Sequence, residues 1–505
     1  MSGIKMHQKL PNNWEDREKL RNKGQFWTPS WVAQAMVEYV IENSDLVFDP
    51  ATGKGAFYDA LKKCRRLQKK PVKFYGIDID EKVINEGTIE GYYNEQDCIL
   101  EVRDFIFNPP KQTFKSIVAN PPYIRHHRLD LQTKAKLKEI SQRVLGFTID
   151  SRAGLHVYFL VQALNVLEKE GKLAFIMPAD TCEGIFAARL WDWIAKRYYI
   201  ECVINFSPEA TPFPNVDTNP IVFLIANKKT AKQLSWVISK KANTYDLRNF
   251  IQSKFKKSDF PSLEIINRDL GEALKTGLSR SPQKDTDARY KLADFARVMR
   301  GIATGANEFF HLTKEQAIKL NIPEEYLKPA IGRTRDIEGS YVDSETLRRL
   351  DEKGRPTLLL SLDGKETGEF PEEIRKHILS GEKLKLNMRS LIKTRKPWYK
   401  MEKREIPDFL FAYLGRRNAR FIKNNANVLV LTGFLCIYSK SKNRDYIEKL
   451  WQILQHAGTV DNLRLVGKTY GGGAIKVEPR AMDNLPIPEH LVEKYKLEPI
   501  KDTLF

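Results

Sequence analysis

Short apolar runs alternate with longer amphipathic stretches along the first half of the chain. Where apolar positions recur at helical spacing, as from Val32 to Val40, we expect helices. No hairpin signal joins the early runs, so strand and helix alternate, which predicts an α/β domain with a mainly parallel sheet. Seven runs rich in β-branched and aromatic residues are predicted strands: Leu46–Phe48, Lys73–Ile77, Ile99–Val102, Ser116–Ala119, Leu173–Met177, Cys202–Asn205 and Ile221–Ile225.

The fourth predicted strand stops at Asn120-Pro121-Pro122-Tyr123. The two prolines remove backbone donors and fix φ, so the loop is stiff. It lies at the carboxyl edge of the sheet, where open α/β folds bind ligands. The Asn120 side-chain oxygen and the Pro121 carbonyl can both accept from one planar NH2 group, and Tyr123 offers a ring for stacking a heterocycle. These groups suit methylation of an exocyclic amine; the alternative is a Pro-rich turn with Tyr123 packed in the core.

A second group of candidate residues lies where the first three strands end. The run from Asp49 to Gly55 holds a Gly-x-Gly turn, which brings backbone N–H groups against a ligand. It lacks the third glycine of a nicotinamide-cofactor fingerprint and the Gly-Lys-Ser/Thr of a P-loop. Asp78 and Asp104 end the next two strands, and Phe105 is either an adenine-stacking wall or core. Three acids at one edge suit a ligand with an ammonium group, a ribose and an adenine, such as S-adenosyl-L-methionine (SAM).

The composition indicates the kind of binding partner and the cellular compartment. The formal net charge is +19, from 83 Lys+Arg against 64 Asp+Glu, which favours a polyanion, most simply nucleic acid. Five scattered cysteines without a Cys-x-x-Cys pair favour a reduced cytoplasm over a disulfide scaffold or zinc site. No apolar run approaches the roughly 18–20 residues of a membrane span, and His126-His127 lacks a third metal ligand at a recognised spacing. We expect a cytoplasmic protein that needs neither membrane nor metal.

The distribution of residue types predicts four regions. Residues 1–24 form a polar N-terminal arm, and 25–240 hold the strands and candidate sites described above. Residues 241–290 are polar and lack clear periodicity, so we expect a connector. Residues 291–505 combine short strands, many Gly and Pro, and arginines between aromatics, which predicts a mixed α+β domain.

Together these motifs resemble those of the gamma-class DNA adenine-N6 methyltransferases of the TaqI type, which serve restriction–modification systems. The resemblance covers residues 25–226 in motif order and 291–488 more loosely. It implies a class I SAM-dependent methyltransferase fold, Rossmann-like with a mainly parallel seven-stranded sheet. It also implies that residues 291–505 are a DNA target-recognition domain, since the gamma class places its cofactor motifs first, the catalytic loop second and this domain last.

The resemblance also implies roles for individual residues. The catalytic group would be Asn120, Pro121, Pro122, Tyr123 and Phe213, the last helping to hold the flipped base. Thr28 is in addition a candidate helix N-cap, with Pro29 at the first helical position. The cofactor would contact Phe26, Thr28, Asp49, Pro50, Ala51, Gly53, Gly55, Asp78, Ile79, Asp104, Phe105 and Asn120. Candidate DNA-binding residues are Arg125, Arg333, Arg335, Arg416, Arg417, Arg420 and Lys476.

The activity implied by the resemblance is methyl transfer from SAM to the amino nitrogen of an adenine flipped out of double-stranded DNA. Such an enzyme protects host DNA, and its matching partner would be a restriction endonuclease on a separate chain. Two alternatives stay open. One is a methyltransferase acting on another amine, in RNA or in a protein glutamine, which has little use for the basic second half. The other is a DNA-binding modification subunit with an inert fold, against which the complete motif set argues.

Overall fold

The computed structural model describes residues 26–500 except 43, 69–70, 94–95, 183–185, 214–215, 217, 281, 283–287, 413–418 and 471–473. The side chains of residues 65–68, 464, 468–470 and 474–476 are also not described. The chain divides at residue 282 into two compact units, with residues 470–472 assigned to the first. In the described part of the chain, every helix is too short or too polar to cross a bilayer.

A nine-stranded sheet, counted over the described residues, forms the centre of the first unit. Its order is β3-β2-β1-β4-β5-β7-β6-β8-β9, with parallel pairing except where β7 meets β5 and β6 and where β9 meets β8. The predicted α/β fold with a mainly parallel sheet is confirmed, although two strands extend the expected seven. The strands are β1 (Leu46–Asp49), β2 (Lys73–Asp78), β3 (Cys98–Val102), β4 (Phe114–Ala119), β5 (Leu167–Pro178), β6 (Tyr199–Phe206), β7 (Pro220–Ala226), β8 (Gln233–Ser239) and β9 (Leu263–Asp269).

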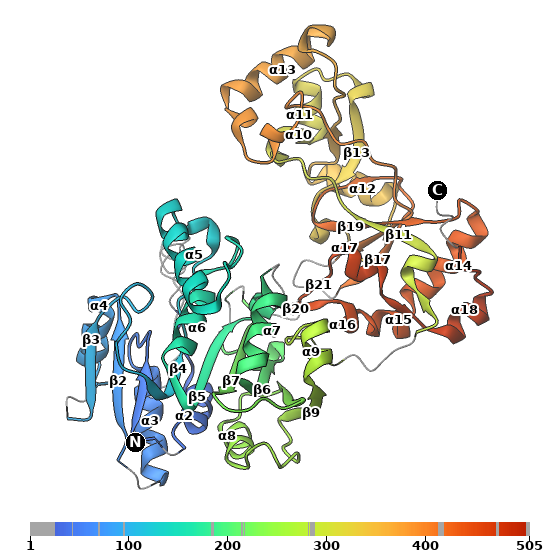
Figure 1. Ribbon diagram of the computed structural model, residues 1–505. Coiled ribbons are helices and arrows are strands. Elements are labelled where there is room, and N and C mark those ends of the chain that lie inside the picture. Colours follow the sequence, from blue (N-terminus) through green and yellow to red (C-terminus); the bar gives the residue numbers. More distant parts are fainter. Residues whose placement is uncertain are drawn as a thin grey trace. The chain divides into compact units, whose positions relative to one another are not determined.

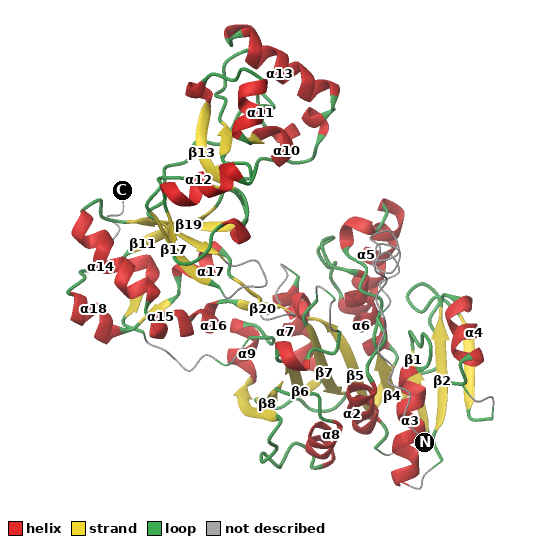
Figure 2. Cartoon of the chain, turned by 180° about the vertical axis from the view of Figure 1, so that it is seen from behind, coloured by secondary structure: helices red, strands yellow, loops and turns green. Residues whose placement is uncertain are grey.

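Helices cover both faces of this sheet (Figures 1 and 2). One face packs against α2, α3 and α8, and the other against α5, α6, α7 and α9, so the unit has two apolar cores. Because the central strands are buried on both faces, β7 is apolar and buried along its whole length instead of alternating. The helices are α2 (Ser30–Val40), α3 (Ala56–Gln68), α4 (Glu81–Ile89), α5 (Leu131–Leu145), α6 (Leu155–Asn165), α7 (Ala187–Arg197), α8 (Thr244–Gln252) and α9 (Leu270–Thr276).

Most of the predicted connector, residues 241–290, is instead part of the first unit. Helix α8 packs on α2, where the Arg248 guanidinium pairs with the Glu38 carboxylate at 2.8 Å. Strand β9 then forms the edge of the sheet. The seven residues of β9 mix apolar, polar and charged side chains without strict alternation, so they carry little periodic signal and the sequence pattern missed the strand.

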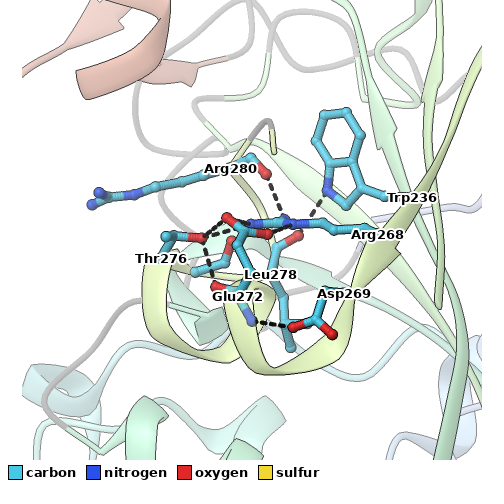
Figure 3. A network of polar contacts seen from close by, with 8 residues as sticks. Trp236, Arg268, Asp269, Glu272, Thr276, Leu278 and Arg280 are labelled. Atoms are coloured by element: carbon cyan, nitrogen blue, oxygen red, sulfur yellow. Dashed lines mark hydrogen bonds and ion pairs between the residues drawn. The ribbon is translucent and has the colours of Figure 1, made fainter. Parts of the chain in front are cut away.

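A buried arginine holds the end of this unit together (Figure 3). The Arg268 guanidinium contacts the Glu272 carboxylate at 2.6 and 3.1 Å, the Thr276 hydroxyl at 2.6 Å and the Arg280 carbonyl at 2.7 Å. The Trp236 indole N–H on β8 donates to the Leu278 carbonyl at 2.9 Å. Polar contacts therefore hold helix α9 and residues 277–280 against the sheet edge.

Helix α2 begins one residue later than predicted. It starts at Ser30, and Pro29 is the N-cap with φ −66° and ψ 146°, an extended conformation. Thr28 does not cap the helix, because its hydroxyl accepts a hydrogen bond from Asn120 instead. The sequence analysis expected Thr28 to cap the helix that follows it, whereas in the structure its side chain contacts Asn120 in the loop after β4.

The second unit is mixed α+β with separate sheets, as predicted. Its five-stranded sheet has the order β11-β19-β16-β17-β14 and a four-stranded sheet the order β12-β15-β13-β18, counted over the described residues. Its strands are β10 (Tyr290–Lys291), β11 (Ala296–Arg300), β12 (His311–Leu312), β13 (Leu327–Ile331), β14 (Tyr341–Val342), β15 (Leu358–Leu360), β16 (Phe409–Ala412), β17 (Arg420–Asn424), β18 (Leu429–Val430), β19 (Phe434–Ser439) and β22 (Pro486–Ile487), with β20 (Lys468–Tyr470) and β21 (Ala474–Lys476) forming a further pair.

Helices of the second unit pack on these sheets around separate apolar cores. One core lies between the five-stranded sheet and α14, and another lies under α10 and α13, beside the four-stranded sheet. We call the part built on this second core, residues 302–330 and 357–401, the upper lobe. The helices are α10 (Asn307–Phe310), α11 (Lys314–Lys319), α12 (Ser344–Glu352), α13 (Glu372–Lys383), α14 (Arg444–Gln455), α15 (Ala457–Asp461), α16 (Leu463–Val466), α17 (Pro479–Asp483) and α18 (Glu489–Tyr495).

Candidate active site

A cavity of about 210 Å³ lies at the carboxyl ends of β1 to β4 in the first unit. Ten of the twelve residues predicted to contact a cofactor line it, whereas Asp49 and Gly55 lie beside it without lining it. The ten are Phe26, Thr28, Pro50, Ala51, Gly53, Asp78, Ile79, Asp104, Phe105 and Asn120. Residues far apart in the sequence therefore meet at one edge of the sheet, as the topology requires.

The turn between β1 and α3 forms one wall of the cavity. Gly53 has φ +53° and Gly55 has φ +94°, conformations that favour glycine. A Cβ at Gly53 would lie 2.7 Å from the Trp27 ring, so a larger residue does not fit. The Tyr93 hydroxyl donates to the Gly53 carbonyl at 2.8 Å and holds the turn in place. Lys54 is paired with Glu86 and Glu90 of α4, at 2.9 and 2.7 Å, and does not line the cavity.

The three strand-end acids are held differently. Asp49 is fully buried: its Oδ1 accepts from the Ala51 N–H at 3.0 Å, whereas Oδ2 has no partner among the described residues. Burial raises the pKa of Asp49 well above its usual range. A buried oxygen without a donor is costly, so Asp49 is suited to a cationic or hydrogen-bond-donating ligand.

Asp78 and Asp104 are positioned by backbone N–H groups. Asp78 accepts from the Gly53 N–H at 2.9 Å and from the Asp80 N–H at 3.0 Å, which ties the end of β2 to the glycine turn. Burial raises the pKa of Asp78. Asp104 uses Oδ1 for the N–H groups of residues 106 and 107, at 2.9 and 3.0 Å, which leaves Oδ2 as the acceptor available to a ligand.

The orientation of the Asn120 amide is defined by two hydrogen bonds. Its Nδ2 donates to the Phe26 carbonyl at 2.6 Å and to the Thr28 hydroxyl at 3.1 Å. Both N–H groups are thereby used, and Oδ1 is the polar atom left to accept a hydrogen bond from a ligand. The segment before α2 thus holds Asn120 ready to accept from an amine.

Three aromatic rings meet beside Asn120. Tyr123 lies 5.7 Å from Phe26 and 6.2 Å from Phe213, and Phe26 lies 5.8 Å from Phe213, measured between ring centroids. The Tyr123 hydroxyl donates to the Ile176 carbonyl on β5 at 3.1 Å, and burial raises the pKa of Tyr123. The structure therefore brings Tyr123 and Phe213 together, and it adds Phe26, which the sequence analysis had assigned only to the cofactor.

Sequence reasoning missed several residues of this region. Phe159 of α6 lines the cavity, and the His156 ring of the same helix lies 5.9 Å from Tyr123. His156 is buried, its Nδ1 has no partner among the described residues, and burial lowers its pKa to about 4. The apolar pattern predicted helix α6 but not which of its side chains reach the site.

The predicted DNA-binding residues are spread over both units. Arg125 is exposed beyond the catalytic loop, and Arg333 and Arg335 are exposed in the second unit. Arg420 instead donates to the carbonyls of Gly339 at 2.8 Å and Ile337 at 2.7 Å, which gives it a structural role. Arg416, Arg417 and the Lys476 side chain lie outside the described residues. Over the described residues, no group of three His, Cys, Asp or Glu side chains is arranged to hold a metal.

Comparison with known proteins identifies the family of this chain. The family model "N-6 DNA Methylase" matches residues 13–272, and the C-terminal domain of the Type II methyltransferase M.Eco57I matches residues 281–504. The Type II methyltransferase M.AccI of Acinetobacter calcoaceticus is 26% identical over 479 residues, which cover 93% of this chain and 85% of M.AccI. M.XamI of Xanthomonas campestris pv. amaranthicola is 23% identical over 482 residues, covering 92% and 85% of the two chains.

Solved structures show the same fold. The Type IIL restriction-modification enzyme MmeI, solved in complex with DNA, superposes with a TM-score of 0.55 at 15% identity. The match covers 95% of this chain and 65% of MmeI, so this chain spans just under two thirds of that enzyme. With the N-6 DNA methylase model matching more than half of its residues, this chain belongs to the N-6 family of DNA methyltransferases.

Proposed function

We propose that this DNA methyltransferase transfers a methyl group from SAM to the exocyclic amino nitrogen of an adenine flipped out of double-stranded DNA. The observation that carries the proposal is the Asn120 amide, whose two N–H groups are occupied by Phe26 and Thr28 so that Oδ1 can accept from an amine. The order of the motifs in the chain supports assignment to the gamma class. The basic composition, with a net charge of +19, supports DNA as the substrate.

The residues of the cavity suit SAM by their chemistry. Asp49 lies beside the cavity, and its unpartnered Oδ2 would accept from the cofactor's ammonium group; Asp78, which lines the cavity, would accept from the ribose hydroxyls. Asp104 Oδ2 would accept from the adenine amine, against the Phe105 ring. When bound, SAM supplies a methyl group activated by a positively charged sulfur.

The chain's own contribution is to position the target base. Asn120 Oδ1 and the Pro121 carbonyl would accept both hydrogens of the adenine amine, which turns the nitrogen lone pair toward the methyl donor. The same two oxygens stabilise the positive charge that develops on nitrogen before the proton leaves. Tyr123 and Phe213 would hold the flipped base by stacking. Unstacking the base costs a few kcal/mol, which contacts to the DNA must offset.

The biological setting follows from the relatives, which are Type II methyltransferases of bacteria. We propose that this enzyme protects DNA at one target sequence in the cytoplasm of a prokaryotic cell. A restriction endonuclease on a separate chain would be its counterpart. Such a pair requires that both enzymes recognise the same sequence.

A labelled-methyl transfer assay tests the proposal. The purified chain is incubated with SAM carrying a labelled methyl group and with unmethylated genomic DNA, and the digested nucleosides are separated. We expect the label in N6-methyladenine, with none above background for Asn120→Ala, which should still bind SAM in calorimetry. Label in cytosine or no label in the DNA would refute the proposal, as would full activity of Asn120→Ala.

A further inference from the structure

A basic segment follows helix α13 in the upper lobe of the second unit (Figure 1). Residues 383–396, which we call the basic loop, contain six basic and no acidic side chains. Four of the six, Lys383, Lys385, Lys393 and Lys396, are exposed and form no ion pair among the described residues. This concentration of unneutralised charge requires an explanation, because a folded surface normally mixes both signs.

The same loop exposes large apolar side chains. Leu384 is 68% exposed, Met388 71% and Leu391 45%. The loop itself is anchored, since Leu386 and Ile392 are buried in the core of the lobe. Three apolar side chains are thus presented to solvent from a fixed backbone, between lysines on either side.

The remaining two basic residues fix the loop to the lobe. Arg389 pairs with Glu308 at 2.7 Å and donates to the Gly305 carbonyl at 3.2 Å. Arg395 donates to the Ala303 carbonyl and lies over the Phe310 ring, 5.8 Å from its centroid. Some residues of the basic loop therefore anchor it to the lobe. The three exposed apolar side chains and the four exposed lysines have no such role within the described part of the chain.

We propose that the basic loop is a DNA-binding element that places Leu384, Met388 and Leu391 into the minor groove while its four exposed lysines contact the flanking phosphates. Proteins that distort DNA use this combination: apolar side chains enter between base steps and basic residues neutralise the backbone. The inference rests on the proposed function, because it takes duplex DNA as the substrate. It adds a surface that contains none of the arginines predicted from the sequence to bind DNA.

The composition of the loop favours DNA over the other partners of an apolar surface. Lysine is depleted in protein–protein interfaces, where burying its ammonium group is costly, whereas phosphate contacts use it commonly. A membrane-surface element is typically a long amphipathic helix. Here Leu384 is the C-cap of α13, Met388 lies on the 3-10 turn Leu386–Met388, and Leu391 directly precedes the turn Ile392–Thr394.

The proposed contact also has a consequence for catalysis. Partial unstacking of base steps by an apolar wedge lowers the additional cost of rotating the target adenine out of the duplex. Removing the wedge should then slow methyl transfer to duplex DNA more than transfer to single-stranded DNA, where no stack has to be broken.

Two sets of substitutions in the full chain test the apolar side chains and the lysines of the basic loop separately. The wedge variant carries Leu384→Ala, Met388→Ala and Leu391→Ala, and the charge variant carries Gln at the four exposed lysines. A matched charge control carries Gln at three lysines that are exposed elsewhere in the second unit: Lys319, Lys328 and Lys353. Ile318→Ala, at a site 74% exposed on α11, is the matched apolar control. Thermal melts verify that each variant is folded.

The measurement is the dissociation constant for a mixed-sequence DNA duplex over a series of salt concentrations. Each lost phosphate contact reduces the slope of log K against log salt by about 0.9, so the charge variant, which loses four, should lose about 3.6 units of slope. The wedge variant should keep the slope, bind about 10-fold more weakly as a central apolar contact does, and lose the bend reported by energy transfer between dyes at the duplex ends. Both controls should behave as the unmodified chain.

The outcomes distinguish this inference from the proposed function. If the unmodified chain binds no duplex, the proposed function fails. If it binds duplex with a steep salt dependence that the charge variant retains in full, only the basic-loop inference is overturned. A wedge variant with unchanged DNA affinity and bending, but an altered oligomeric state in solution, would show that the loop is a protein interface instead.

Discussion

The orientation of Asn120 can be tested by changing a residue that does not supply the proposed acceptor. The Thr28 side chain is 2% exposed, and its hydroxyl accepts from Asn120 Nδ2 at 3.1 Å. Thr28→Val keeps the shape of the side chain but removes the acceptor. One N–H of Asn120 is then unpaired, while the other still donates to the Phe26 carbonyl at 2.6 Å.

The size of the effect follows from these two bonds. Leaving a buried donor unpaired costs about 1–3 kcal/mol. Because the shorter bond to Phe26 survives, we expect the lower part of this range, about 1–2 kcal/mol, in the barrier to methyl transfer. That is a decrease of about 5–30-fold in rate. Asn120→Ala removes the acceptor itself and should cost about 100-fold or more, as loss of a preorganised charge-stabilising group does.

Single-turnover methyl transfer at saturating SAM and DNA measures this barrier. Calorimetry with SAM gives the cofactor affinity separately, which we expect to change by less than the rate does. Thr28→Ser retains the hydroxyl and is the matched control, with a rate near that of the unmodified enzyme. A normal rate for Thr28→Val together with a collapse of SAM affinity would refute the reasoning, because Thr28 would then act on the cofactor and not on Asn120.

Three further predictions concern the fold around the site. Arg268→Ala should lower the free energy of unfolding by about 3–5 kcal/mol in urea melts, because it leaves the buried partners of that guanidinium unpaired; a loss below 1 kcal/mol would contradict the network. Burial lowers the pKa of His156 to about 4 in the folded chain, against about 6.5 unfolded, so the unfolded state binds more protons between these values. The free energy of unfolding should therefore decrease by up to about 3 kcal/mol as the pH is lowered through this range. His156→Phe should remove that part of the acid sensitivity, and an unchanged pH profile would exclude His156 as its source. Gly53→Ala should weaken SAM binding in calorimetry, because its Cβ would lie 2.7 Å from the Trp27 ring at φ +53°; unchanged affinity would show that the turn adapts.

Local signals in the sequence determined the central strands and the chemistry at their ends. Strands buried on both faces are apolar, so β7 and the end of β4 from Ile117 to Ala119 were recognisable from composition alone. The Asn120–Tyr123 loop and the glycine turn were equally readable, because prolines and glycines restrict or free φ within a few residues. Since parallel strands end at one edge, the acids that end β1 and β2 and the acid that follows β3 were expected together; Asp78 and Asp104 line the cavity, and Asp49 lies beside it.

Only the tertiary structure decided what those groups touch. Thr28 and Asn120 are 92 residues apart, and nothing near either residue predicts their hydrogen bond. Strand β9 and the buried Arg268 were missed, and Arg420 was assigned to DNA although it binds two backbone carbonyls. For Thr28 and Arg420 the physical reason is that a polar partner is selected by the folding of distant segments against each other, which patterns of neighbouring residues do not report. The partners of Arg268 are near in sequence, but the burial of its guanidinium depends on the pairing of β9 with β8.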